Sequence, residues 1–368
     1  MLMKWSARRN LIIALVMLMP LIESCSYIGP NSVNNDRRRY NEVLQATNDE
    51  ELLLNLVRMR YSDTPSFVNV NSITSQLSVS ASTSATHSQT GNSIGLAISS
   101  ITKSLTPSFS ISESPVISYA PLQGDQYVRE FITPLNSNLL ALLGASGWPM
   151  NATLKLVLTR MNDVWNAPSA SRPSPKTAPN FEQFDELLFN LDKMGHGVQL
   201  GYSVIGKQSL PSLRFEPGVL ETPPGKNVTR ILGLAPGMNV FALLANDWAK
   251  KKGVINIQTR SVLGTLYLLS HNVDVPAEHV DRGWVGKTLK SDGTDFDWDL
   301  VTKGLFKVRV GSEKPSDSDI AVEYRNKWFS IARNDLNTKM VFTMLSQLLS
   351  LQSGTSDVKA PALTIPLN

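Results

Sequence analysis

Cysteine is nearly absent from this sequence of 368 residues, and the single one is Cys25. No disulfide can form within the chain, so the fold must depend on its core. Charged residues are also scarce, at 18% of the chain against 42% hydrophobic residues, and the formal net charge is only +4. A balance so close to neutral gives no basic surface for nucleic acid, so we expect no nucleic-acid partner.

Histidine is almost as scarce as cysteine. The four in the chain are His87, His196, His271 and His279. None stands with a cysteine or a carboxylate at the spacing of metal ligands, so we predict neither a metal site nor a cofactor. Ser203 lies between glycines that are one residue too far apart for a nucleophile turn, and we interpret this serine as structural.

One aspartate pattern comes close to a calcium loop. Asp295, Asp297 and Asp299 occupy alternate positions, as in the first half of such a loop. However, Leu300 stands where the loop needs glycine, and Phe306 stands where it needs its closing carboxylate. We expect these aspartates to cap a helix on a surface loop. With no catalytic constellation visible, we predict that the protein is not an enzyme.

A long apolar run is also missing. The apolar run at residues 11–19 is closed by Pro20, whereas a membrane span needs about eighteen or more apolar residues. Lys4, Arg8 and Arg9 precede the run. Basic residues followed by a short apolar run are typical of a secretory signal peptide.

Residues 21–25, with the sequence LIESC, resemble the lipobox of bacterial lipoproteins. Ile22 stands at the branched aliphatic position and Ser24 at the small one, while Glu23 departs from the pattern. The resemblance implies that residues 1–24 are removed and that Cys25 carries diacylglycerol on sulfur and an acyl chain, such as palmitate, on its amine. The alternative for a lone cysteine is a buried free thiol.

The resemblance also implies a location. Three acyl chains give a membrane anchor that does not dissociate usefully. Ser26 follows the cysteine, where lipoproteins of the inner membrane tend to have aspartate. We therefore expect a cell outer membrane protein, lipid-anchored through Cys25 and facing the periplasm. Loss of Lys4, Arg8, Arg9 and Glu23 with the signal would lower its net charge from +4 to +2.

The expected fold class is α+β, with a long hairpin in the first of two domains. The segments are a signal peptide (1–24), a lipidated tether (25–35), a domain of helix, β-hairpin and helices (36–166), a proline-rich linker (167–180), a second α+β domain (181–354) and a tail (355–368). The linker assignment rests on four prolines among small polar residues.

The first domain opens with a helical pattern. Thr47 and Glu50 have the spacing of a capping box, ahead of a helix at residues 51–61. Its apolar stripe, which we expect to pack in the core, consists of Leu52, Leu53, Leu56 and Met59. Asn55 is expected on the polar face.

Between Val68 and Ala120 the composition changes abruptly. Of these 53 residues, 22 are Ser or Thr, and only Lys103 and Glu113 are charged. Apolar residues alternate in runs at 73–83 and 93–102, which predicts a long β-hairpin with its tip near residues 84–92. A third run at 109–119 predicts an additional strand.

Two explanations of this hairpin remain open. In the first, it belongs to a periplasmic sheet with one face on the core. In the second, each subunit contributes two strands to a shared barrel in the outer membrane, which needs strands of about nine to eleven residues with an apolar outer face. Length and charge fit the second explanation, whereas the interruptions at Ser75 and Ser100 and the missing aromatic girdle do not.

The rest of the chain alternates between helical and strand patterns. Helices are predicted at 125–132, 138–143, 150–165, 181–194, 237–252, 259–271 and 335–351, and strands at 198–204, 213–216, 228–232, 305–310, 320–323 and 328–331. We expect Trp148 and Trp165 to close apolar helices as core residues. Lys250, Lys251 and Lys252 suit a helix C-terminus, with a phospholipid headgroup contact as the alternative.

Three further segments resemble proteobacterial exported lipoproteins of unassigned function: residues 51–65, Trp148 with the two residues before it, and residues 304–309. This resemblance implies no activity. We therefore expect a non-enzymatic structural or assembly component of a cell-envelope complex, with self-association or envelope proteins as partners. The alternatives are an envelope enzyme such as a cell-wall hydrolase, which requires a deep pocket with converging acids, and a lipid- or glycan-binding module, which requires an apolar cavity.

Overall fold

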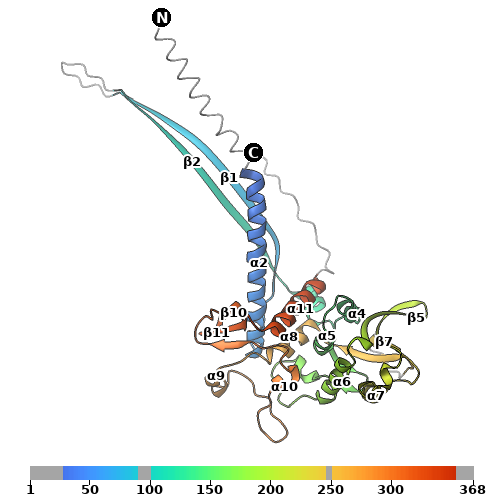
Figure 1. Ribbon diagram of the computed structural model, residues 1–368. Coiled ribbons are helices and arrows are strands. Elements are labelled where there is room, and N and C mark those ends of the chain that lie inside the picture. Colours follow the sequence, from blue (N-terminus) through green and yellow to red (C-terminus); the bar gives the residue numbers. More distant parts are fainter. Residues whose placement is uncertain (1–27, 90–100, 246–250, 354–368) are drawn as a thin grey trace, which may run out of the picture. The chain divides into compact units, whose positions relative to one another are not determined.

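The computed structural model describes residues 28–89, 101–245 and 251–353, and Figure 1 shows it as a ribbon. Its contacts divide the chain into two units. Unit 1 consists of Met1–Pro65 and Asp125–Ser356, and unit 2 of Ser66–Gly124 and Asp357–Asn368. Helices and strands both contribute, which confirms the α+β fold class. The boundary does not fall at the expected linker, because residues 167–180 lie inside unit 1.

The first described element of unit 1 is a single long helix, α2 (Ile28–Arg60). It begins inside the segment expected to be an irregular tether, and it runs through the expected capping box. The hydroxyl of Thr47 donates back to the carbonyl of Val43 at 2.9 Å, so this residue lies within the helix rather than at its start. The expected stripe at Leu52, Leu53, Leu56 and Met59 is buried. Asn55, expected on the polar face, is fully buried as well.

Unit 2 contains an antiparallel ribbon of two strands, β1 (Val68–Gln89) and β2 (Ile101–Pro121). The hairpin is confirmed, but residues 84–89 of the expected tip still belong to the ladder, because Ser84 pairs with Thr106 and Gln89 pairs with Ile101, and residues 90–92 lie outside the described residues. The expected third strand at 109–119 is the second half of β2. The run at 93–100 lies outside the described residues.

The larger sheet of unit 1 has six strands in the order β4-β3-β8-β7-β6-β5. They are β3 (Leu158–Met161), β4 (Val164–Trp165), β5 (Val198–Ile205), β6 (Gln208–Phe215), β7 (Val240–Ala245) and β8 (Val254–Thr259). Only β7 and β8 run parallel, and the other neighbours are antiparallel. All four residues of β3 and the middle residues of β7 are buried, as is typical of strands covered on both faces, and the sequence of β7 is continuously apolar rather than alternating.

That burial explains two wrong helix predictions. The helix expected at 150–165 ends at Val157, where β3 begins, and all four residues of β3 are buried. The helix expected at 237–252 contains β7 instead, whose middle residues are buried. A short apolar run cannot be assigned to strand or helix by periodicity alone. Lys251 lies shortly ahead of β8, and Lys250 lies outside the described residues.

Helices α4, α5 and α6 contact strands of this sheet, and all the helices between α2 and the last helix of unit 1 are shorter than α2 (Figure 1). They are α3 (Gly124–Tyr127), the π-helix η1 (Val128–Ile132), α4 (Asn138–Ala145), α5 (Met150–Val157), η2 (Pro168–Ser171), α6 (Glu182–Lys193), η3 (Gly195–Gly197), η4 (Val219–Glu221), α7 (Pro223–Leu232), α8 (Val262–Ser270), α9 (Ala277–Asp281) and α10 (Asp299–Thr302). Helix α7 occupies the strand expected at 228–232. Thr222 caps its first turn, and Gly233 ends it in the left-handed conformation at φ 63°.

A smaller sheet has the order β10-β11-β9. Its strands are β9 (Arg309–Gly311), β10 (Ser318–Tyr324) and β11 (Lys327–Ala332), and the last helix, α11 (Leu336–Ser353), follows it. Asp335 accepts the backbone N–H of Thr338 at 3.0 Å, which confirms the expected cap of this helix. The strands near 320–323 and 328–331 are confirmed, and so are the cores of α4, α6 and α8.

Candidate functional site

The ribbon of β1 and β2 is the most unusual element of the described chain. Its 22-residue β1 pairs along its whole length with β2, from Val68 opposite Pro121 to Gln89 opposite Ile101. At about 3.3 Å per residue, such a strand spans roughly 70 Å. Within the described residues, these two strands form a sheet of their own with no third strand. Two-stranded ribbons are at best marginally stable in water, so this one needs further contacts.

The two outer edges of the ribbon differ in their hydrogen-bond donors. β2 contains Pro107, Pro115 and Pro121, which have no N–H, whereas β1 contains no proline. The three prolines are separated by even numbers of residues, so their nitrogens all lie on one side of the strand. Proline is tolerated where that side faces outward from the ladder. The outer edge of β2 is therefore interrupted, whereas β1 has no proline to interrupt its outer edge.

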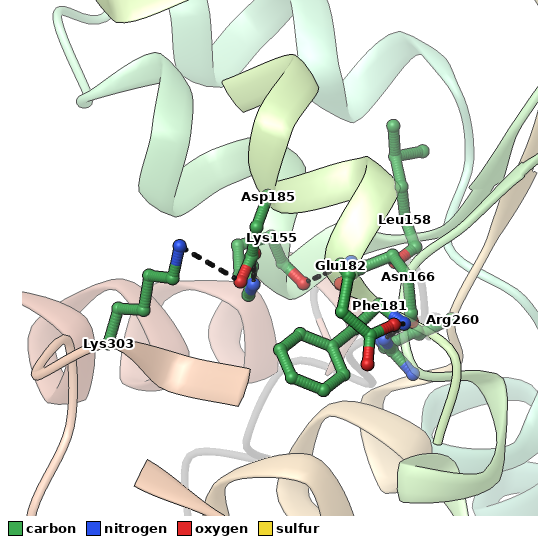
Figure 2. Close-up of polar contacts among 8 residues, drawn as sticks. All are labelled: Lys155, Leu158, Asn166, Phe181, Glu182, Asp185, Arg260 and Lys303. Atoms are coloured by element: carbon green, nitrogen blue, oxygen red, sulfur yellow. Dashed lines mark hydrogen bonds and ion pairs between the residues drawn. The ribbon is translucent and has the colours of Figure 1, made fainter. Parts of the chain in front are cut away.

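A second unusual feature is a buried charge cluster in unit 1, shown in Figure 2. Lys155 on α5 donates to Asp185 on α6, and the two side chains are only 3% and 6% exposed. Lys303, at the end of α10, approaches the other oxygen of Asp185 at 3.2 Å and is largely exposed. Burial lowers the pKa of Lys155, and the charge of Asp185 opposes that shift.

A lysine with a lowered pKa is a candidate base or nucleophile where a substrate can reach it. Here the ammonium group is enclosed and engaged by Asp185, so its contacts join helix α5 to helix α6. Asn166 lies beside it and donates to the carbonyls of Lys155 and Leu158 at 2.8 and 2.6 Å. The arrangement thus holds the junction of α5 and β3 in place.

The fully buried guanidinium of Arg260 explains why residues 167–180 are not a linker. Arg260 follows β8 and donates to the carbonyl of Asn166 and to the hydroxyl of Ser171, as well as to the carbonyl of Ala167 at 3.4 Å. Ala167 and Ala170 are themselves fully buried. Because a buried cation needs several acceptors, the proline-rich segment packs against the core instead of bridging two domains.

Comparison with known proteins assigns neither a family nor a function to the chain. No family model matches the chain, and no curated protein or solved structure matches it either.

Two histidines are buried at separate places. His279 accepts or donates a 2.7 Å hydrogen bond with the hydroxyl of Tyr61, at the end of α2, and the tautomer decides which. His271 stacks on Trp298 with ring centroids 4.0 Å apart, and burial lowers its pKa to about 3. Over the described ranges, no group of three or more His, Cys, Asp or Glu side chains is placed to hold a metal ion.

The contacts of Tyr61 dock the end of α2 on the smaller sheet. Arg325 lies over its ring at 4.9 Å from the centroid and also forms an ion pair with Asp63 at 2.9 Å. Tyr324 donates to the same carboxylate. Burial raises the pKa of Tyr61 to about 12, so its hydroxyl stays protonated. This cluster connects the C-terminal end of α2 to strand β10.

The other residues singled out in the sequence lie at separate places in the fold and form no common site. Ser203 lies in β5, where its hydroxyl accepts from Ser212 at 2.8 Å, as a structural serine would. Asp297 accepts the backbone N–H of Asp299 at the start of α10, consistent with the expected capping on a loop. Trp165, expected in the core, is 37% exposed because it ends the two-residue strand β4.

Cys25, the single predicted site residue, lies outside the described residues. For the part of the chain that is described, no helix has the length and apolar character needed to cross a membrane.

Sequence reasoning missed Lys155, Asp185 and Arg260. Lys155 lies between Leu154 and Leu156 in an apolar helix, which is a weak signal that its charge must be compensated. Nothing in the sequence links it to a carboxylate thirty residues away, because that contact depends on the packing of α5 on α6.

Proposed function

We propose that the protein is an outer-membrane lipoprotein, anchored through Cys25, that acts as a non-enzymatic assembly component of a cell-envelope complex. The ribbon of β1 and β2 carries this proposal. Long strand edges attract further strands unless they are covered, charged or interrupted by proline. The edge of β2 has proline interruptions, and the edge of β1 has none.

In the proposed assembly, copies of the chain pair through the outer edges of their β1 strands. Main-chain donors and acceptors along a strand are complementary to those of a second identical strand in antiparallel orientation. Pairing of β1 with β1 is therefore an isologous contact with two-fold symmetry. It would convert two marginal two-stranded ribbons into one four-stranded sheet, and sheets of three or more strands are the ones that are stable independently.

The register of the ribbon supplies a test. Thr83 is opposite Pro107 and Ser75 is opposite Pro115. Two residues opposite each other in an antiparallel pair point their N–H groups either both into the ladder or both out of it. The N–H groups of Ser75 and Thr83 therefore face outward if the nitrogens of the opposite prolines do. The double substitution Ser75→Pro and Thr83→Pro should then remove donors from the outer edge of β1 without breaking the β1–β2 ladder.

The assay is native mass spectrometry of the full chain in detergent. We expect the parent and the control with Ser75→Ala and Thr83→Ala to associate, and the double proline variant to be monomeric with unchanged circular dichroism. A monomeric parent chain, or a proline variant that associates as well as the parent, would contradict the proposal.

The anchor has its own test. Mass spectrometry of the N-terminal peptide from membrane fractions should find residues 1–24 absent and Cys25 lipidated. An unmodified Cys25 or an intact leader would refute the lipoprotein assignment and would leave the pairing of β1 to be judged separately.

A further inference from the structure

A polar cavity of about 260 Å³ lies in unit 1, among the turn between β3 and β4, the end of α7 and the start of β8. Its polar lining consists of Arg160, Asn162, Asp163, Arg230, Lys251 and Asn256. Three of these side chains are cationic and one is a carboxylate, so the lining carries net positive charge. A concave site of one predominant sign concentrates ligands of the opposite sign.

Arg160 provides the buried cation of this cavity. It is 9% exposed, and its guanidinium carbon lies 5.2 Å from the ring centroid of Trp165. An aromatic face against the guanidinium limits the orientations that the side chain can adopt. The planar fork of arginine matches the oxygens of a phosphate group better than a lysine ammonium does.

Asn162 fixes the wall of the cavity. Its side chain donates to the carbonyl of Leu232 at 2.6 Å and accepts the backbone N–H of Asn256 at 2.8 Å. Its own backbone N–H donates to the carbonyl of Asn256 at 2.7 Å. These bonds join the β3–β4 turn to α7 and β8, so the cavity is preformed rather than assembled by a ligand.

The rim adds two cations from other elements. Arg230 belongs to the last turn of α7, and Lys251 precedes β8. Arg230 uses Nη2 for an exposed ion pair with Glu186 at 2.8 Å, and a guanidinium has five N–H donors in all. Asp163 partly offsets this charge, which favours a group with one or two negative charges over a polyanion.

We propose that this cavity binds a phosphate group, with Arg160 as its buried ligand and Lys251 and Arg230 at the rim. This inference is independent of the pairing of β1. The group could belong to free phosphate or to a phospholipid headgroup, and both present the same oxygens to the cavity.

The test uses the full chain with Cys25→Ser, so that no lipid anchor contributes to vesicle binding. Its first arm measures the thermal midpoint with inorganic phosphate against chloride of equal ionic strength. The second arm measures cosedimentation with phosphatidylcholine vesicles with and without phosphatidic acid. Ligand binding to the folded state raises the midpoint with concentration.

Lys251→Gln and Lys252→Gln form a matched pair, since both residues are exposed and only Lys251 lines the cavity. We expect Lys251→Gln to weaken binding about tenfold, as for the loss of one charge-assisted contact, and Lys252→Gln to change it less than twofold. Arg160→Gln should abolish binding. If that buried substitution unfolds the chain, the lysine pair decides the question alone.

A phosphate response that depends on Lys251 supports the proposal with free phosphate as ligand. Binding seen only with phosphatidic acid, and again dependent on Lys251, supports it with a headgroup as ligand. No response in either arm, or equal losses in Lys251→Gln and Lys252→Gln, overturns it.

Discussion

Asp185→Asn is the substitution that most sharply tests the buried charge cluster. It removes the carboxylate that engages Lys155, whose side chain is 3% exposed. Breaking a buried ion pair from one side costs about 3–5 kcal/mol, because an uncompensated charge stays buried. Lys303 offers no compensation, since it is cationic as well. At about 2–4 °C per kcal/mol, the thermal midpoint should fall by roughly 6–20 °C.

The neighbouring carboxylate provides the control. Glu186, on the same helix, pairs with Arg230 at the surface, where both side chains are about half exposed. Exposed pairs contribute about 0–1 kcal/mol, so Glu186→Gln should leave the midpoint almost unchanged. A double substitution, Lys155→Met with Asp185→Leu, should recover most of the lost stability, because apolar residues can replace a buried pair without penalty.

The pH dependence gives a second measure of the same substitution. Burial already lowers the pKa of Lys155, and loss of Asp185 removes the charge that opposes this shift. Between the lowered folded pKa of Lys155 and its unfolded pKa, the unfolded chain binds more protons than the folded one, so the stability of Asp185→Asn should rise with pH over that window. Equal urea midpoints for Asp185→Asn and Glu186→Gln at pH 7 would refute the reasoning.

Two further substitutions test the packing and the titration of unit 1. Gly144→Ala should lower the free energy of unfolding in urea by about 1–3 kcal/mol, because the added Cβ would lie 2.3 Å from the backbone oxygen of Leu200. Gly201→Ala is the control, since its added Cβ would meet nothing within 4 Å and the free energy of unfolding should not change. Similar losses in both variants would contradict the close contact of α4 with β5. The folded pKa of His271, lowered to about 3 by burial, makes the unfolded state bind more protons below pH 6.5, so stability should fall by up to about 1.4 kcal/mol per pH unit as the pH drops from 6.5 to 5. His271→Asn should make that fall shallower, and an unchanged slope would show that His271 is not its source.

The sequence predicts well the elements whose burial is one-sided. The stripe of α2, the helices α4, α6 and α11 and the hairpin of β10 and β11 all have a period or a cap that can be counted along the chain. The inner strands β3 and β7 were predicted as helices, because burial on both faces removes the alternation that distinguishes a strand.

Long-range contacts account for the other differences. Residues 167–180 have the composition of a linker, but hydrogen bonds from Arg260, His271 and Thr288, all far along the chain, hold them in the core. Strand β1 is longer than the alternating apolar run at 73–83, because Ser and Thr residues continue the strand beyond that run as far as Gln89. No short-range pattern in the sequence predicts the contact between Lys155 and Asp185, because these residues are 30 positions apart.

The central claim, pairing of copies through β1, is tested most directly by cysteine cross-linking of the full chain. Each variant carries one new cysteine at a serine of β1 (72, 75, 78, 80, 82, 84 or 88) or, as matched controls, at Ser110 and Ser108, which lie opposite Ser80 and Ser82. The parent with Cys25 alone controls for cross-links through that residue. We expect disulfide dimers that peak at neighbouring β1 positions around the two-fold axis and are absent from the β2 controls. No dimer from any β1 position, or equal dimer from Ser108 and Ser110, would contradict the claim.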